Sequence, residues 1–114
     1  MAVNKVKTSR KDEPKSDFIF LNVQKKKVRI LFAEILYIES QKEYIKIKTT
    51  QKEFISKMGT HEIEAILPAH LFKRVHRSFI VSVSKIDSYT ADMVEVSGVS
   101  IPIGRGYRDV MEGL

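Results

Sequence analysis

The sequence contains no cysteine among its 114 residues. A disulfide framework and thiolate metal sites are therefore excluded, and this composition fits a reducing cytoplasm. No stretch is long and apolar enough to cross a membrane. The N-terminal segment MAVNKVKTSRKDEPKSD lacks the apolar core of a signal peptide. We therefore expect a cytoplasmic protein with no membrane partner.

Motifs of common enzymes are also missing. There is no Walker loop and no Rossmann fingerprint, and GRG at 104–106 is too short to form a phosphate loop. The three histidines have no carboxylate at metal-ligand spacing, and His76 and Ser78 lack the orienting acid that a serine nucleophile needs. The sequence therefore predicts no enzyme, no catalytic residue, no metal site and no cofactor.

Positive charge is what the sequence does have. The net charge is +6 and the pI is about 9.6. Residues 1–17 hold five Lys/Arg and three Asp/Glu and almost nothing large and apolar, as in a flexible basic tail or an interdomain linker. A basic balance favours a polyanionic partner, with nucleic acid first and an anionic membrane surface second.

From residue 18 onward the dominant period is two, which is typical of β-strands. In EYIKIKT, for example, Ile45 and Ile47 are predicted to face the core. The segment THEIEAILPAHLF predicts one short helix, with Thr60 as its N-cap and Pro68 ending it. The predicted strands cover residues 18–24, 28–31, 35–40, 43–49, 53–58, 78–82, 86–90, 93–97 and 99–103. This pattern indicates one mostly-β domain at 18–114, a layered β-sheet sandwich with one short helix.

Three clusters of long donor side chains fall where strands are expected to connect. They are ESQKEY (39–44), KRVHRS (73–78) and GRGYR (104–108). Arginine can read guanine with two hydrogen bonds or clamp a phosphate, and lysine, serine and tyrosine can bind phosphates. Loops that each carry one such residue could enter separate grooves of a duplex.

Other polar and aromatic residues have simpler interpretations. The run Lys25–Lys27 is expected to be a solvated hairpin turn, and Arg74 could pair with a carboxylate inside the domain. Lys46 and Lys48 form the wet face of a strand or contact phosphates. The six phenylalanines, at positions 18, 20, 32, 54, 72 and 79, are predicted to be core rather than base-stacking platforms.

The stretches ILYIESQKEYIKIKT, LPAHLFKRVHRSFIVSVSKI and IPIGRGYRDVM resemble the LytTR-type DNA-binding domain of bacterial response regulators. The resemblance runs over about 18–110, and its most specific part is F-x-R-V-H-R-S-F-I-V at 72–81. It implies sheets packed in layers with a small helix, not a helix-turn-helix. It further implies a transcriptional regulator whose loops enter successive major grooves of duplex DNA, bend it and often recognise direct repeats.

Carried onto this sequence, the resemblance makes Arg105 and Arg77 candidate base readers, with the preferred base of Arg77 left open. A further base contact is expected within 42–44, where Lys42 is chosen for its chemistry. The candidates for contacts with the DNA backbone, or for support of the loops, are Ser40, Lys46, Arg74, His76, Ser78, Tyr107 and Arg108.

Members of this family usually follow a receiver domain that carries a phosphorylated aspartate, and 114 residues leave no room for one. Residues 1–17 are therefore either the end of a linker in an excised domain or the tail of a protein that stands alone. A homodimer on DNA is one route to control. Two alternatives stay open: a non-specific nucleic-acid or RNA-binding β module, and a protein-interaction domain with an acidic partner.

Overall fold

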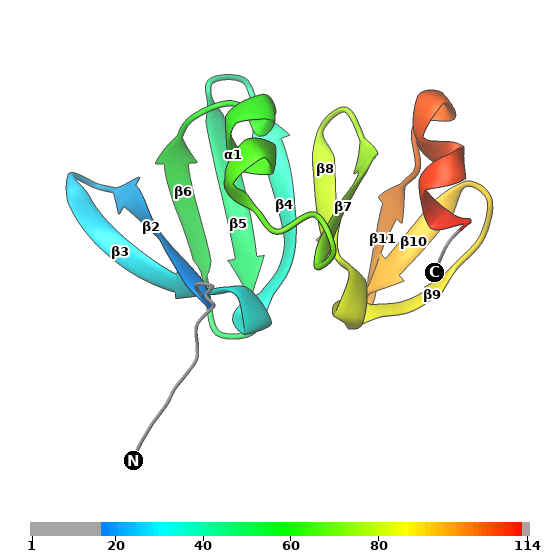
Figure 1. Cartoon of the computed structure of the whole chain (residues 1–114), viewed down its shortest axis with the longest axis horizontal. Helices are drawn as coiled ribbons and strands as arrows, with labels where there is room; N and C mark the ends of the chain where they lie inside the picture. The colour runs from blue at the N-terminus through cyan, green and yellow to red at the C-terminus, as the bar shows by residue number, and fades with distance from the viewer. Residues whose placement is uncertain (1–16, 113–114) are drawn as a thin grey trace, which may run out of the picture.

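Within residues 17–112, which the computed structural model describes, the chain forms three antiparallel sheets and four short helical segments (Figure 1). The strands are β2 (Phe18–Val23), β3 (Lys26–Leu31), β4 (Ile35–Gln41), β5 (Tyr44–Thr49), β6 (Glu53–Lys57), β7 (Phe72–His76), β8 (Phe79–Ser82), β9 (Ile86–Tyr89), β10 (Met93–Val96) and β11 (Val99–Pro102). The α-helix is α1 (Thr60–Ile66), and the 3₁₀ segments are η2 (Phe32–Glu34), η3 (Val83–Lys85) and η4 (Arg105–Met111).

The largest sheet has five strands in the order β6-β5-β4-β8-β7. Its centre is the antiparallel pairing of β4 with β8, in which Tyr37 lies opposite Val81 and Ile38 opposite Ile80. The hairpin β2–β3 lies beside β6 at one end of the molecule, and the sheet β11-β10-β9 lies at the other end (Figure 1).

The central sheet separates two apolar cores. Because successive side chains of a strand point to opposite faces, Ile38 and Ile80 enter one core while Tyr37 and Val81 enter the other. The first core lies against α1 and the β2–β3 hairpin, and it is formed mainly by Leu21, Ile30, Phe32, Ile35, Ile38, Ile45, Ile47, Ile63, Leu67, Phe72 and Ile80. The second core lies against the three-stranded sheet and η4, and it is formed by Leu36, Tyr37, Val75, Val81, Val94, Val96, Ile101, Ile103 and Met111.

Three hairpin turns contain residues with positive φ. Gln24 and Lys25 connect β2 to β3 with φ values of 51° and 68°, and Lys42 begins the β4–β5 turn at 57°. Ser97 and Gly98 connect β10 to β11 at 48° and 80°. Left-handed residues of this kind match the twist of the flanking strands, so these turns are tight and fix the register of their hairpins.

The predicted fold class is confirmed: the described chain is mostly strand, arranged in layered sheets. The alternation in β5 is also as predicted, since Ile45 and Ile47 are fully buried while Lys46 and Lys48 face outward. No helix within residues 17–112 is long and apolar enough to span a membrane. The prediction of a tail at 1–17 falls on residues outside the described range, apart from Asp17.

Some boundaries were wrong. The helix begins at Thr60 rather than being capped by it, because the capping residue is Gly59, whose N–H donates to Glu62 Oε1 at 2.9 Å. Residues 72–76 form strand β7, so only Arg77 and Ser78 make the second connection. Lys26 and Lys27 belong to β3, which leaves Lys25 alone in the predicted lysine turn. Phe20 is 53% exposed and is not a core residue.

Candidate nucleic-acid interface

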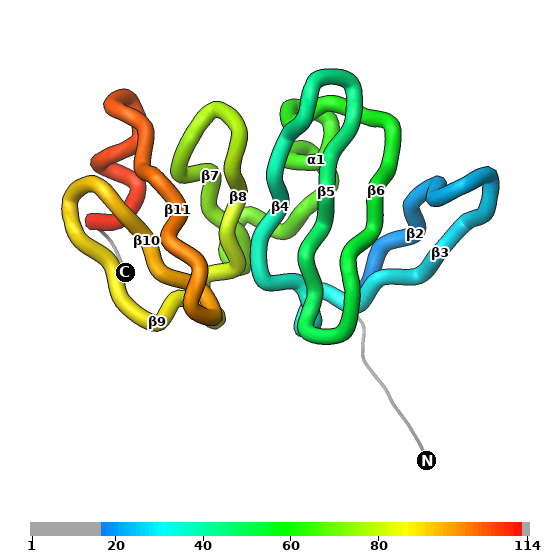
Figure 2. The backbone as a smooth tube through the Cα atoms, turned by 180° about the vertical axis from the view of Figure 1, so that it is seen from behind, coloured from blue at the N-terminus to red at the C-terminus, as the bar shows by residue number. Residues whose placement is uncertain are grey.

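Three connections lie along one edge of the molecule (Figure 1). They are the β4–β5 turn with Lys42, the β7–β8 turn with Arg77, and the junction of β11 with η4, which carries Arg105. All three side chains are exposed. The view from behind places the same three connections on the same edge (Figure 2). The structure therefore brings together the three residues predicted to read bases, and we call this the cationic edge.

Backbone hydrogen bonds join neighbouring connections of the cationic edge. The Ser40 N–H donates to the Ser78 carbonyl at 2.8 Å, which ties the first turn to the second. The Gly104 N–H donates to the Val75 carbonyl at 2.8 Å, which ties the second to the third. Main-chain contacts thus link the three connections to one another.

Arg74 reaches three parts of the fold from strand β7. Its Nη1 lies 3.0 Å from Glu64 Oε1 on α1, and its Nη2 donates to the Arg77 carbonyl at 2.7 Å. The guanidinium carbon lies 5.9 Å from the centre of the Tyr107 ring on η4. Both terminal nitrogens of Arg74 thus bond inside the domain, as expected for a side chain that supports the β7–β8 turn.

His76 also supports the β7–β8 turn. Its Nδ1 accepts a hydrogen bond from the Ser78 N–H at 3.0 Å, in the tautomer that this contact requires. Its ring packs edge-on against Phe79, with the ring centres 5.7 Å apart. Ser78 in turn offers its carbonyl to Ser40, so the main chain of the turn is bonded on both sides.

The segment η4 is anchored at its start by Gly104. The Tyr107 N–H donates to the Gly104 carbonyl at 2.9 Å, and a Cβ on Gly104 would lie only 3.0 Å from Tyr107 Cδ2. Arg108 forms an exposed ion pair with Asp92 at 2.7 Å. Because pairs at the surface are weak, Arg108 stays available to another anion.

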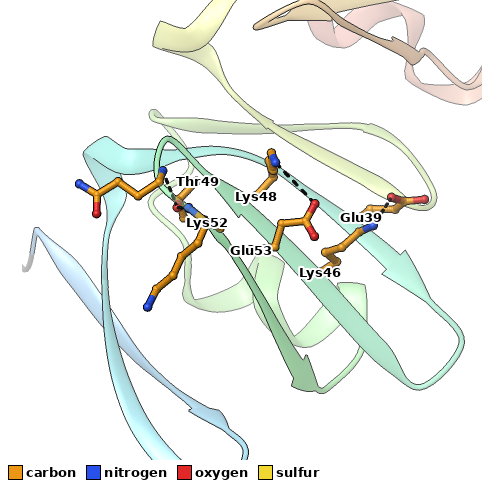
Figure 3. Close-up of polar contacts among 7 residues, drawn as sticks. Glu39, Lys46, Lys48, Thr49, Lys52 and Glu53 are labelled. Carbon is orange, nitrogen blue, oxygen red and sulfur yellow. Dashed lines mark hydrogen bonds and ion pairs between the residues drawn. The ribbon is translucent and has the colours of Figure 1, made fainter.

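Lys46 lies on the outward face of the central sheet, opposite Glu39 and two residues after the start of β5 (Figure 3). Its Nζ is 4.0 Å from Glu39 Oε1, and a second pair on this face joins Lys48 to Glu53 at 3.6 Å. Both lysines are partly neutralised, so this face carries less positive potential than its lysines alone indicate.

Sequence reasoning did not identify Glu64 as the partner of Arg74. The two residues are on different elements, and no spacing rule connects them. The expectation that Arg74 could pair with a carboxylate is confirmed, but only the placement of α1 beside β7 shows which one. Between residues 17 and 112, no three His, Asp or Glu side chains are grouped as a metal ion would require.

Comparison with known proteins agrees with this arrangement. The LytTr DNA-binding domain family matches residues 25–113. An uncharacterized response regulatory protein of Vibrio cholerae is 26% identical over an aligned length of 88, covering 69% of this chain and 34% of that protein. The chain therefore spans about a third of the length of this relative. A LytTr DNA-binding domain of a response regulator from Bacillus cereus has a TM-score of 0.75 at 22% identity, covering 87% of this chain and 96% of that one. The chain belongs to the LytTr family of DNA-binding domains.

Proposed function

We propose that this domain binds duplex DNA sequence-specifically through its cationic edge and acts as the output module of a bacterial transcriptional regulator. The observation that carries the proposal is the alignment of Lys42, Arg77 and Arg105 on three connections linked by main-chain contacts. A rigid row of long donors on short connections can enter grooves without moving the strands behind it.

In this proposal, Arg77 and Arg105 read base edges in the major groove. Arginine can donate two parallel hydrogen bonds to guanine O6 and N7, which distinguishes that base from the others. Lys42 supplies the third base contact from the turn that lies furthest from η4. The three connections enter successive grooves, and a bend in the duplex brings their contacts into reach together.

The remaining residues divide into two groups. Ser40, Lys46, Ser78, Tyr107 and Arg108 lie near the readers and contact phosphates, which sets the register of the domain on the duplex. Arg74 and His76 hold the β7–β8 turn in shape. Repeated sites, a homodimer on DNA, an upstream receiver domain and a cytoplasmic location are further parts of this proposal, and the similarity to one part of a response regulatory protein supports the receiver domain.

Selection of bound duplexes from a random pool tests this function. We expect a recovered motif, followed by anisotropy titrations in which Arg77→Ala or Arg105→Ala each costs about 1–3 kcal/mol on the selected duplex and relaxes preference at one position. Arg29→Ala is the matched control, because it removes the same charge from the outer face of β3, where the guanidinium lies over Phe18.

The alternatives give different results in the same experiment. A non-specific nucleic-acid binder would return no motif and would bind single strands equally well. A domain for an acidic protein partner would bind every duplex weakly and lose that binding by physiological salt. An unchanged affinity for Arg105→Ala on a recovered motif would refute the assignment of Arg105 as a reader.

A further inference from the structure

A second basic surface lies beside the cationic edge, between the β2–β3 hairpin and strand β6. It is an open groove with a volume of about 1130 Å³. Lys25 and Lys26 line it from the hairpin, and Lys52 and Lys57 line it from the two ends of β6. The sequence predicted only a solvated hairpin turn for Lys25–Lys27, and it did not predict that Lys25 and Lys26 line a groove.

The groove has an excess of positive charge. Its single acidic lining residue, Glu53, is paired with Lys48 at 3.6 Å (Figure 3). None of the ion pairs found among residues 17–112 involves the four lysines of the groove. Lys52 Nζ lies 5.1 Å from the centre of the Phe54 ring, so its ammonium group already has a cation–π contact within the domain. Lys25, Lys26 and Lys57 therefore carry the potential of the groove.

These three lysines lie next to the first base-reading turn. Lys57 is the direct cross-strand partner of Tyr44, which follows the Lys42–Glu43 turn. Lys26 pairs with Val23 at the closed end of the hairpin. In Figure 1 the β4–β5 turn points up, the closed end of the hairpin points up and outward to the left, and the hairpin lies on the side away from η4. The groove thus continues the cationic edge past its first connection.

A duplex aligned with the cationic edge and extended past the β4–β5 turn would approach this groove. B-DNA carries one negative charge per about 1.7 Å of axis, so any helix extending past the β4–β5 turn brings phosphates to that end of the molecule. The longest dimension of the molecule, 50 Å, corresponds to about 15 base pairs at about 3.4 Å each. Lysine binds phosphate as a point charge without reading sequence, as flanking contacts require.

We propose that Lys25, Lys26 and Lys57 bind the phosphate backbone of the DNA that flanks the base-read site on the side of the β4–β5 turn. The inference rests on the proposed DNA-binding function and extends its footprint to the N-terminal hairpin. These contacts add affinity and salt dependence to the complex and leave base preference unchanged.

Duplex length gives the first test. The selected motif is placed in a short duplex that ends with the motif, and in two longer duplexes extended by about 6 base pairs on one side or the other. Extension on one side only should tighten binding of the wild-type domain by about tenfold and steepen the salt dependence. Equal gains on both sides, or no gain on either, would overturn the proposal.

A charge-matched pair of variants gives the second test. Lys26→Gln with Lys57→Gln should abolish the gain from the productive extension and lower the salt slope on that duplex by about 2, at about 0.9 per phosphate. The control is Lys27→Gln with Lys85→Gln, which removes two charges from the outer face of β3 and from η3 at the opposite edge (Figure 1). The control should keep the gain.

The two tests separate this inference from the function on which it rests. If no motif is recovered and Arg105→Ala changes nothing, the proposed function fails, and the flanking contact that rests on it fails with it. If the motif is recovered and Arg105→Ala weakens binding, but the groove variant keeps the gain from extension, the flanking contact alone fails. An acidic protein surface would then be the next ligand to test in the groove.

Discussion

Arg74 and Glu64 join the helix α1 to the β7–β8 turn through a single contact, with Arg74 Nη1 3.0 Å from Glu64 Oε1. The same guanidinium donates from Nη2 to the carbonyl of Arg77, so the main chain behind a proposed base reader is bonded to the helix through one side chain. The Arg74 side chain is 20% exposed, and that of Glu64 is 45% exposed. Arg74 is therefore better placed to position Arg77 than to meet a phosphate.

Replacing Arg74 should separate these two roles. Arg74→Gln is expected to lower the free energy of unfolding by about 1–2 kcal/mol, because the Arg77 carbonyl loses a charged donor. Affinity should fall more on the selected duplex than on a random duplex, since the placement of Arg77 is lost. Urea unfolding and anisotropy on both duplexes measure this. Glu64→Gln, the control, should cost less than about 1 kcal/mol. Equal losses on both duplexes with unchanged stability would instead make Arg74 a phosphate contact.

Gly104 and Gly106 flank Arg105 but should respond differently to alanine. A Cβ at Gly104 would meet Tyr107 Cδ2 at 3.0 Å and the His76 main chain at 3.6 Å, whereas a Cβ at Gly106 would meet nothing within 4 Å. Gly104→Ala is therefore expected to destabilise the domain by about 1–3 kcal/mol. Gly106→Ala should be neutral or stabilise it by up to about 1 kcal/mol. Thermal unfolding of both variants compares them, and equal midpoints would contradict the crowding at Gly104.

Lys42 combines an unfavourable backbone with a proposed base contact. Its φ of 57° is a left-handed value that glycine adopts without steric cost. Lys42→Gly should therefore raise the free energy of unfolding by about 0.5–1 kcal/mol while weakening sequence-specific binding. Lys25→Gly is the matched control, because Lys25 has a φ of 68° in another hairpin turn. It should give the same gain in stability and leave base preference unchanged. A loss of preference in both variants would contradict the assignment of Lys42.

Tyr37 should make the domain sensitive to alkali. Burial raises the pKa of the Tyr37 phenol above 10.0, and the Glu39 and Glu53 carboxylates raise this pKa further. Above pH 10 the unfolded chain releases this proton while the folded chain retains it, so the free energy of unfolding must fall as pH rises. Tyr37→Phe is expected to flatten this fall in urea unfolding between about pH 8 and 11. Tyr89→Phe removes an exposed phenol and should leave the fall intact.

Regular alternation made most of the strands predictable, and its interruption explains strand β7. In β5 every second residue is buried, and the sequence alone assigns both faces correctly. In β7 the pairing with β8 shifts between Arg74 and His76, which breaks the alternation where five of six residues from 73 to 78 are polar or charged. A five-residue strand with such a bulge has the composition of a loop. Its assignment depends on pairing with a neighbour that the sequence does not reveal.

The positions of the candidate site residues were predictable from the sequence, but the hydrogen bonds that hold their connections together were not. Turn chemistry and charge placed Lys42, Arg77 and Arg105 at connections, because long donors beside glycine or polar residues are typical of loops. The hydrogen bonds between connections, such as Ser40 to Ser78, depend on the order of strands in the sheet. Local sequence cannot specify that order, since β4 pairs with β8 across the whole of β5, β6, α1 and β7.

The pairing of β4 with β8 also sets how the domain can fold. Tyr37 and Val81 are direct partners although 44 positions separate them (81 − 37). The β4–β5–β6 meander and the β7–β8 hairpin can each form locally, but this long-range ladder must close a large loop before its contacts offset the entropy lost. Until it closes, the turns carrying Lys42 and Arg77 are not neighbours. The proposed recognition surface is therefore acquired with the slow, high-contact-order step of folding, and a partly folded chain lacks the assembled cationic edge.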